Sequence, residues 1–144
     1  MKRVKQIGLW FVSALFLTSG VSHFLLTRFF VAIVPPYLPW PYAAVYVSGA
    51  FEIAGAIGLL LPARRRAAGI GLFVLTILVT PANIHMALNP ELFPAFSQSL
   101  LYGRLVAQVG LLALIYAVAI RRPQQSAQPD AQAANVRRAT HEQP

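Results

Sequence analysis

Four apolar stretches, each long enough to cross a lipid bilayer, constrain what this chain can fold into. They cover residues 7–26, 42–61, 67–88 and 100–120, and a membrane-spanning helix needs about 20 predominantly apolar residues. Hydrophobic residues make up 57% of the 144 residues and charged residues only 11%, a balance outside that of soluble domains. The sequence therefore predicts an all-α integral membrane four-helix bundle formed by residues 1–122, with the lipid bilayer as its first partner.

The basic residues around these stretches indicate how the chain crosses the membrane. They cluster before the first stretch, between the second and third at 64–66, and after the fourth at 121–122. Because cytoplasmic loops carry an excess of Lys and Arg, we expect the N-terminus and the C-terminus both to be cytoplasmic. Residues 123–144 are rich in Gln, Ala and Pro and have too few apolar residues to bury a core, so we expect a disordered cytoplasmic tail.

Several functions are excluded by what the sequence lacks. The basic clusters are separated by apolar stretches and not gathered on one face, so we expect no nucleic-acid partner. The chain contains no cysteine, which removes disulfides and cysteine ligands for an iron–sulfur cluster. Phosphate-binding glycine loops, nucleophile elbows and closely spaced metal ligands are missing as well. We therefore predict no catalytic residues and no metal site.

Ionisable side chains within the apolar stretches carry the strongest functional signal. A charged side chain at the bilayer centre costs roughly 2.5–3.5 kcal/mol on insertion scales, so each should point into the bundle and find a partner. Residues three, four and seven apart share a helix face, which places Glu52 on a stripe of small residues and Arg104 beside Gln108. We therefore predict one outward-facing polar pocket. Its predicted ligand-binding residues are His23, Glu52, Asn83, Arg104 and Gln108.

The position of His85 stays open at this point. On an ideal helix its side chain points roughly 200° away from that of Asn83. Pro81 removes one backbone hydrogen bond and can kink the third stretch. Such a kink either brings His85 into the pocket or leaves it at the headgroup boundary.

Each polar residue also has a purely structural interpretation. Glu52 and Arg104 can form an ion pair that locks the second and fourth helices together. His23 lies near a helix end, where an interfacial histidine is common. Asn83 can be an interhelical hydrogen-bond donor, a frequent role for Asn in membrane bundles.

Several short strings follow one another at set spacing along residues 7–120. They are Ser19-Gly20-Val21-Ser22-His23-Phe24, Val34-Pro35-Pro36-Tyr37-Leu38-Pro39, Ser48-Gly49-Ala50-Phe51-Glu52, Leu60-Leu61-Pro62 with the arginines after it, Pro81-Ala82-Asn83-Ile84-His85-Met86-Ala87, and Arg104 with Gln108. In these strings the chain resembles the DoxX-like family of small four-helix bacterial membrane proteins. Val106 is a departure, since the family pattern has proline between the Arg and the Gln.

The resemblance implies a four-helix bundle in the bacterial cytoplasmic (inner) membrane. Some members of that family are linked to quinone-dependent oxidation of sulfur compounds or to membrane oxidoreductase complexes. The resemblance thereby makes a quinone the candidate cofactor and a membrane oxidoreductase the candidate partner.

Three functions fit these observations. The first is an accessory or redox-complex subunit, a non-catalytic part of a quinone-linked oxidoreductase, that binds a lipophilic small molecule such as a quinone in the pocket. The second is a small proton-coupled carrier that uses Glu52 and works as a homo-oligomer. The third is a structural membrane scaffold without a ligand, whose polar residues only fix helix pairing.

Overall fold

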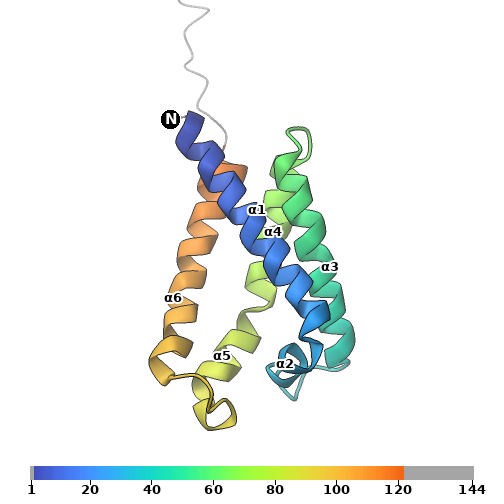
Figure 1. The fold of residues 1–144 in the computed structure, drawn as a ribbon, viewed down its shortest axis with the longest axis vertical. Coiled ribbons are helices and arrows are strands. Elements are labelled where there is room, and N and C mark those ends of the chain that lie inside the picture. Colours follow the sequence, from blue (N-terminus) through green and yellow to red (C-terminus); the bar gives the residue numbers. More distant parts are fainter. Residues whose placement is uncertain (1, 122–144) are drawn as a thin grey trace, which may run out of the picture.

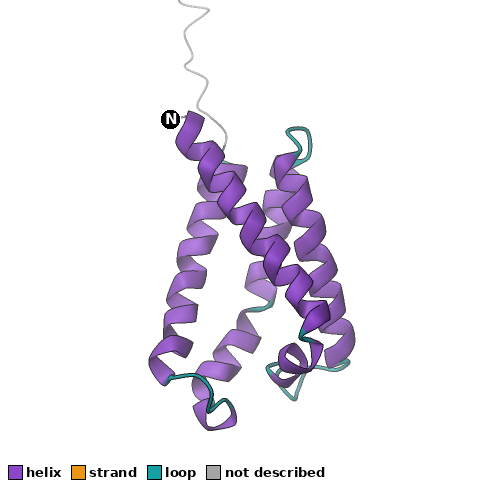
Figure 2. Ribbon diagram, viewed as in Figure 1, coloured by secondary structure: helices purple, strands orange, loops and turns teal. Residues whose placement is uncertain are grey.

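The computed structural model describes residues 2–121, which form a bundle of helices (Figures 1 and 2). In chain order the elements are α1 (Lys2–Leu25), α2 (Thr27–Ala32), α3 (Pro41–Leu60), α4 (Arg65–Leu78), α5 (Thr80–Leu88), the 3-10 helix η1 (Pro90–Leu92), α6 (Gln98–Ile115) and the π-helix η2 (Tyr116–Ile120). The predicted all-α class is confirmed. The tail predicted at 123–144 lies outside the described residues.

Four helical segments are long and apolar enough to cross a membrane. They are Arg3–Leu25, Pro41–Leu60, Arg65–Leu88 and Gln98–Ile120. Their boundaries lie within two residues of the predicted ones except at the start of the first. There α1 continues back to Lys2, because the basic residues before position 7 are themselves good helix formers.

The outer surface of the bundle is apolar, and its interior holds ionisable groups as well as apolar ones. Trp10, Phe51 and Val106 are 58%, 64% and 73% exposed, whereas His23 and Glu52 are only 7% and 5% exposed. A lipid environment favours this arrangement, because it solvates apolar side chains and leaves ionisable ones to find partners inside. The length, composition and surface of the helices together indicate a multi-span membrane protein.

The bundle is tightly packed at the end that carries the start of α1, the α3–α4 turn and η2 (Figure 1). A Cβ atom added to Gly69 of α4 would lie 2.5 Å from the Cβ of Ala119, and one added to Gly8 of α1 would lie 2.8 Å from Cγ1 of Val118. The π-turn of η2, closed by the Arg121 N–H donating to the Tyr116 carbonyl over 2.8 Å, faces both glycines. The first core cluster lies here and comprises Leu9, Val12, Phe16, Ala56, Leu59, Leu72, Ile115, Val118 and Ala119.

A second, smaller core cluster lies towards the opposite end and is completed by the segment around α2. It comprises Ile33, Met86, Ala87, Phe93 and Leu101. Helix α2 lies between the first two predicted stretches, 7–26 and 42–61, where no helix was predicted. It forms because the prolines of this connection begin only at Pro35, after the helix has ended. Ile33 then packs against α5 and α6 and ties the two halves of the bundle together at this end.

The third span is broken in its middle, as Pro81 predicted. Helix α4 ends at Leu78 and α5 begins at Thr80, and Figure 2 shows the break as a short loop. Proline has no N–H to donate to the preceding turn, and the next N–H, of Ala82, bonds three residues back to the Val79 carbonyl over 3.1 Å. The break lets α4 pack against α3 while α5 packs against α6.

Two glycines let α1 and α3 approach closely, and this contact positions the polar residues described below. A Cβ atom added to Gly20 would lie 2.8 Å from the Gly49 carbonyl oxygen, and one added to Gly49 would lie 2.7 Å from the Cβ of His23. Only residues without a side chain allow helix backbones to come so near. The predicted stripe of small residues around Glu52 therefore meets α1 at Gly49, whereas Gly55 of the same stripe packs against Leu72 of α4.

We expect Gly49→Ala to lower the free energy of unfolding by about 1–3 kcal/mol, since the new methyl group would lie 2.7 Å from the Cβ of His23 and 3.0 Å from both the Gly20 carbonyl oxygen and the ring of Phe24. The matched control is Gly103→Ala, because a Cβ atom at Gly103 of α6 meets nothing within 4 Å. That change should leave stability equal or slightly higher through helix propensity. Thermal unfolding in detergent compares the two variants, and equal stability would contradict the close approach of α1 and α3.

Candidate functional site

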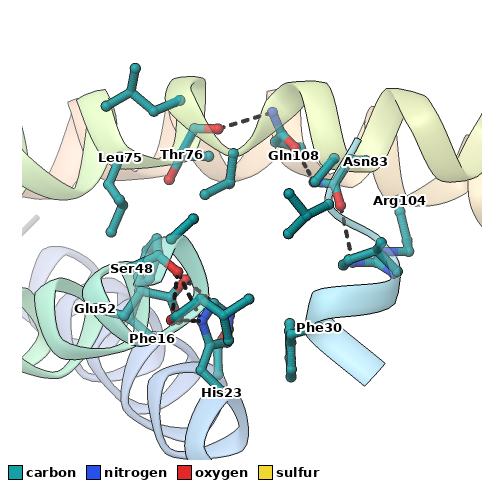
Figure 3. Close-up of a pocket in the computed structure, with 18 of the residues that line it drawn as sticks. Phe16, His23, Phe30, Ser48, Glu52, Leu75, Thr76, Asn83, Arg104 and Gln108 are labelled. Atoms are coloured by element: carbon teal, nitrogen blue, oxygen red, sulfur yellow. Dashed lines mark hydrogen bonds and ion pairs between the residues drawn. The ribbon is translucent and has the colours of Figure 1, made fainter. Parts of the chain in front are cut away.

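A cavity of about 410 Å³ lies between the four spans and is lined by residues from α1 to α6 (Figure 3). Phe16 of the first core cluster and Ile33 of the second both contribute to its lining, so the cavity separates the two clusters. Its volume falls in the range of roughly 300–1,000 Å³ that small-molecule sites occupy. The structure brings all of the predicted site residues to its lining, namely His23, Glu52, Asn83, Arg104 and Gln108.

The first polar wall of the cavity is formed by α1 and α3. The His23 Nδ1 lies 3.0 Å from the Val45 carbonyl oxygen and 2.9 Å from Oγ of Ser48. The Ser48 hydroxyl lies 3.0 Å from the same carbonyl and can donate to it. Because a carbonyl only accepts, we assign the proton of His23 to Nδ1, which leaves Nε2 free to face the cavity.

Glu52 completes this wall beside His23. Its Oε1 lies 3.8 Å from the His23 Nε2, and two lone pairs facing one another at this range would repel. A proton on either group removes the repulsion, which gives a carboxylic acid beside an imidazole or a carboxylate beside an imidazolium. In both forms the His23–Glu52 pair has no net charge. The other oxygen, Oε2, is buried and has no hydrogen-bond partner among the described residues.

The second polar wall, on the opposite side in Figure 3, is a hydrogen-bonded chain across α4, α5 and α6. The Asn83 amide donates to Oε1 of Gln108 over 2.6 Å. The Gln108 amide in turn donates to the Thr80 hydroxyl over 2.6 Å and to the Thr76 carbonyl over 3.3 Å. Gln108 thereby bridges the two halves of the broken third span, and its partners hold Asn83 at the cavity.

Arg104 ends this chain and carries a charge that no carboxylate balances within the described residues. Its Nη2 donates to Oδ1 of Asn83 over 3.1 Å, and its Nη1 donates to the sulfur of Met86 over 3.3 Å. Both partners are neutral, and a guanidinium has five N–H groups to donate. The structural interpretation in which Glu52 and Arg104 form an ion pair is not what the described residues adopt, because Glu52 pairs with His23.

Thr76 and Thr80 of the second wall, together with Phe30 and Ser48, contribute to the site without having been predicted to, and His85 is outside it. The ring of Phe30 on α2 lies 4.0 Å from that of His23 and lines the cavity. Ser48 was expected only as a packing residue, although its place one turn before Glu52 could have indicated a role in the site. His85 bonds to Asn89 through Nδ1 over 3.1 Å and does not line the cavity.

The fold and the site thus define a class: a small multi-span membrane protein with a polar cavity between its four spans. A family model described as a domain of unknown function, DUF8561, matches residues 12–120. The chain belongs to that family. No curated protein and no solved structure matches the chain. This result does not assign the DoxX-like family, so that resemblance stays a prediction.

Double-mutant cycles on thermal stability should show whether Glu52 is coupled energetically to His23 on its own wall or to Arg104 on the opposite wall. We expect Glu52→Gln and His23→Gln to couple by about 0.5–3 kcal/mol, because the two side chains lie next to one another. Glu52→Gln and Arg104→Gln should be additive within about 0.5 kcal/mol, since the two residues have no common partner. Strong coupling between Glu52 and Arg104 would instead indicate that they pair in the folded protein.

Proposed function

We propose that this protein binds a lipophilic small molecule with an oxygen-bearing head, a quinone being the leading candidate, as an accessory subunit of a membrane oxidoreductase. The observation that carries the proposal is the cavity, which has hydrogen-bonding groups on two opposite walls and apolar side chains between them. A ligand drawn from the lipid phase needs both kinds of contact.

A quinone suits the two walls because its ring is apolar and its oxygens lie at opposite ends. The guanidinium of Arg104 and the amide of Asn83 are donors for a quinone carbonyl. On the other wall, the His23–Glu52 pair can give a proton to an oxygen or accept one from it. Phe30 and the aliphatic residues of the lining supply the apolar surface for the ring.

A redox role needs a partner in this proposal. The chain has no cysteine, and the described residues include no group of three or more His, Asp or Glu side chains that could hold a metal ion. Electrons would therefore come from a membrane oxidoreductase that holds the redox centres. We propose no catalytic residue in this chain.

A small proton-coupled carrier is the second candidate. It is favoured by the His23–Glu52 pair, because buried carboxylates that exchange protons often mark transport pathways. Transport by so few spans would call for a homo-oligomer that completes the path. A scaffold without a ligand is the remaining alternative, and the binding experiment below tests it directly.

We propose that both chain ends are cytoplasmic and that the membrane is the bacterial inner membrane. Support comes from the basic clusters, which lie at the end of the bundle that carries η2 (Figure 1). The absence of native cysteine allows single-cysteine labelling with a membrane-impermeant maleimide. Tyr37→Cys should react in intact cells and Ala63→Cys only after the cells are opened, whereas the reverse pattern would invert the proposed orientation.

Titration of the purified protein with decylubiquinone in mild detergent tests the binding proposal. We expect saturable binding in the wild type and about two- to tenfold weaker binding in Asn83→Ala, since one hydrogen bond contributes roughly 0.5–1.5 kcal/mol. Asn89→Ala is the matched control, because Asn89 bonds to His85 outside the cavity. If the wild type shows no saturable binding, the scaffold becomes the better account.

A further inference from the structure

The charges around the cavity do not balance. Among the residues that line it, those that are charged or titratable are His23, Glu52 and Arg104. They come from α1, α3 and α6, and α2, α4 and α5 add no charged or titratable side chain to the lining. Arg28 of α2 is exposed and does not line the cavity. The electrostatics of a bound ligand therefore depend on these three groups.

Two of the three groups cancel one another. The geometry of His23 and Glu52, with Nε2 and Oε1 3.8 Å apart and His23 only 7% exposed, favours a pair that holds one proton. A carboxylate without that proton would be an isolated buried charge, which is strongly unfavourable. The pair contributes no net charge to the cavity.

Arg104 is left with its full positive charge. Its described partners, the Asn83 side-chain oxygen and the Met86 sulfur, are neutral acceptors. A cation at membrane depth with only neutral partners remains costly, and an anion placed beside it would relieve this cost. Guanidinium groups bind oxyanions well, because their N–H donors match two acceptors at once.

We infer that the cavity selects its ligand as an anion, so that the natural ligand is a lipophilic weak acid, such as an acidic hydroxyquinone or another acidic enol or phenol, whose deprotonated oxygen binds Arg104. This inference rests on the proposed function and names the chemical class of ligand for the same site. The acid enters from the lipid as the neutral molecule. Its O–H bond then breaks, the electron pair stays on the oxygen beside Arg104, and the proton is released to water.

The unpartnered oxygen of Glu52 adds selectivity on the opposite wall. Glu52 lines the cavity, and its buried Oε2 has no hydrogen-bond partner among the described residues; such an acceptor gains from a ligand that offers a donor. A ligand with one anionic oxygen and a second hydroxyl group would pair with Arg104 on one wall and donate to Glu52 on the other. A simple alkane or a neutral ester would make neither contact.

A coloured acid and its ether test the inference. The probes are a 2-hydroxy-3-alkyl-1,4-naphthoquinone, whose visible absorbance changes when its hydroxyl ionises, and the matching 2-methoxy compound, which cannot ionise. Each is titrated against the full chain in detergent, and the pH at which the hydroxyl probe ionises is compared with that in empty micelles. The variants are Arg104→Gln, Arg104→Lys, which keeps the charge, and Arg28→Gln as a control on an exposed arginine.

We expect the bound hydroxyl probe to ionise about 1–3 pH units lower than in empty micelles, as an acid does beside an opposite charge. Around neutral pH it should bind at least about tenfold more tightly than the methoxy probe. Arg28→Gln and Arg104→Lys should keep the lower ionisation pH, and Arg104→Gln should lose it. Should Arg104→Gln not fold, the comparison of the two probes on the wild type still decides.

The failures of the two proposals are distinguishable. If the methoxy probe or decylubiquinone binds as well as the hydroxyl probe, and the bound hydroxyl ionises as it does in empty micelles, anion selection is overturned while ligand binding stands. If none of the three compounds binds, both the inference and the proposed function are overturned.

Discussion

Polar side chains placed within membrane-spanning helices have to find their partners inside the bundle, because the lipid around them offers none. In this protein the close contact between Gly20 and Gly49 allows the polar side chains of α1 and α3 to reach one another. It brings α1 and α3 near enough for His23 to contact Ser48 and the Val45 carbonyl at hydrogen-bond distance and for Glu52 to lie beside His23. Larger residues at either glycine would push these groups apart.

On the other side of the cavity, the polar side chains of α4, α5 and α6 find their partners through Gln108. Gln108 reaches from α6 to both halves of the broken third span, and the break at Pro81 turns α5 towards α6. The cavity is therefore the space between two sets of polar side chains, one on α1 and α3 and the other on α4, α5 and α6. Tight packing around η2 joins these two groups of helices at one end, and the contacts of Ile33 near α2 join them at the other.

The two walls differ in charge, and this difference carries the functional argument. One wall holds an acid and a base side by side, Glu52 and His23, and the other ends in a guanidinium with neutral partners. A purely structural cluster would be expected to bring Glu52 and Arg104 together, since that pairing would neutralise both. Their separation on opposite walls favours a ligand that lies between them.

The sequence predicted the spans and the lining residues well, because hydropathy and helix period depend only on local spacing. It placed Glu52 on the small-residue stripe and Arg104 on a face with Gln108, and both line the cavity. It could not decide the partner of Glu52, since a helix period fixes a face but not which neighbouring helix meets it. Helix α2 was missed because it is short and depends on Ile33 packing against distant helices.

Mass spectrometry of small molecules extracted from the protein, purified from its own membranes in mild detergent, tests the central claim most directly. Wild type and Arg28→Gln should carry the same lipophilic, oxygen-bearing compound well above the level in a mock purification, and Arg104→Gln that is still folded should have lost it. Extracts that contain no enriched compound, or the same compound in equal amounts from all three proteins, would contradict a ligand-binding cavity centred on Arg104.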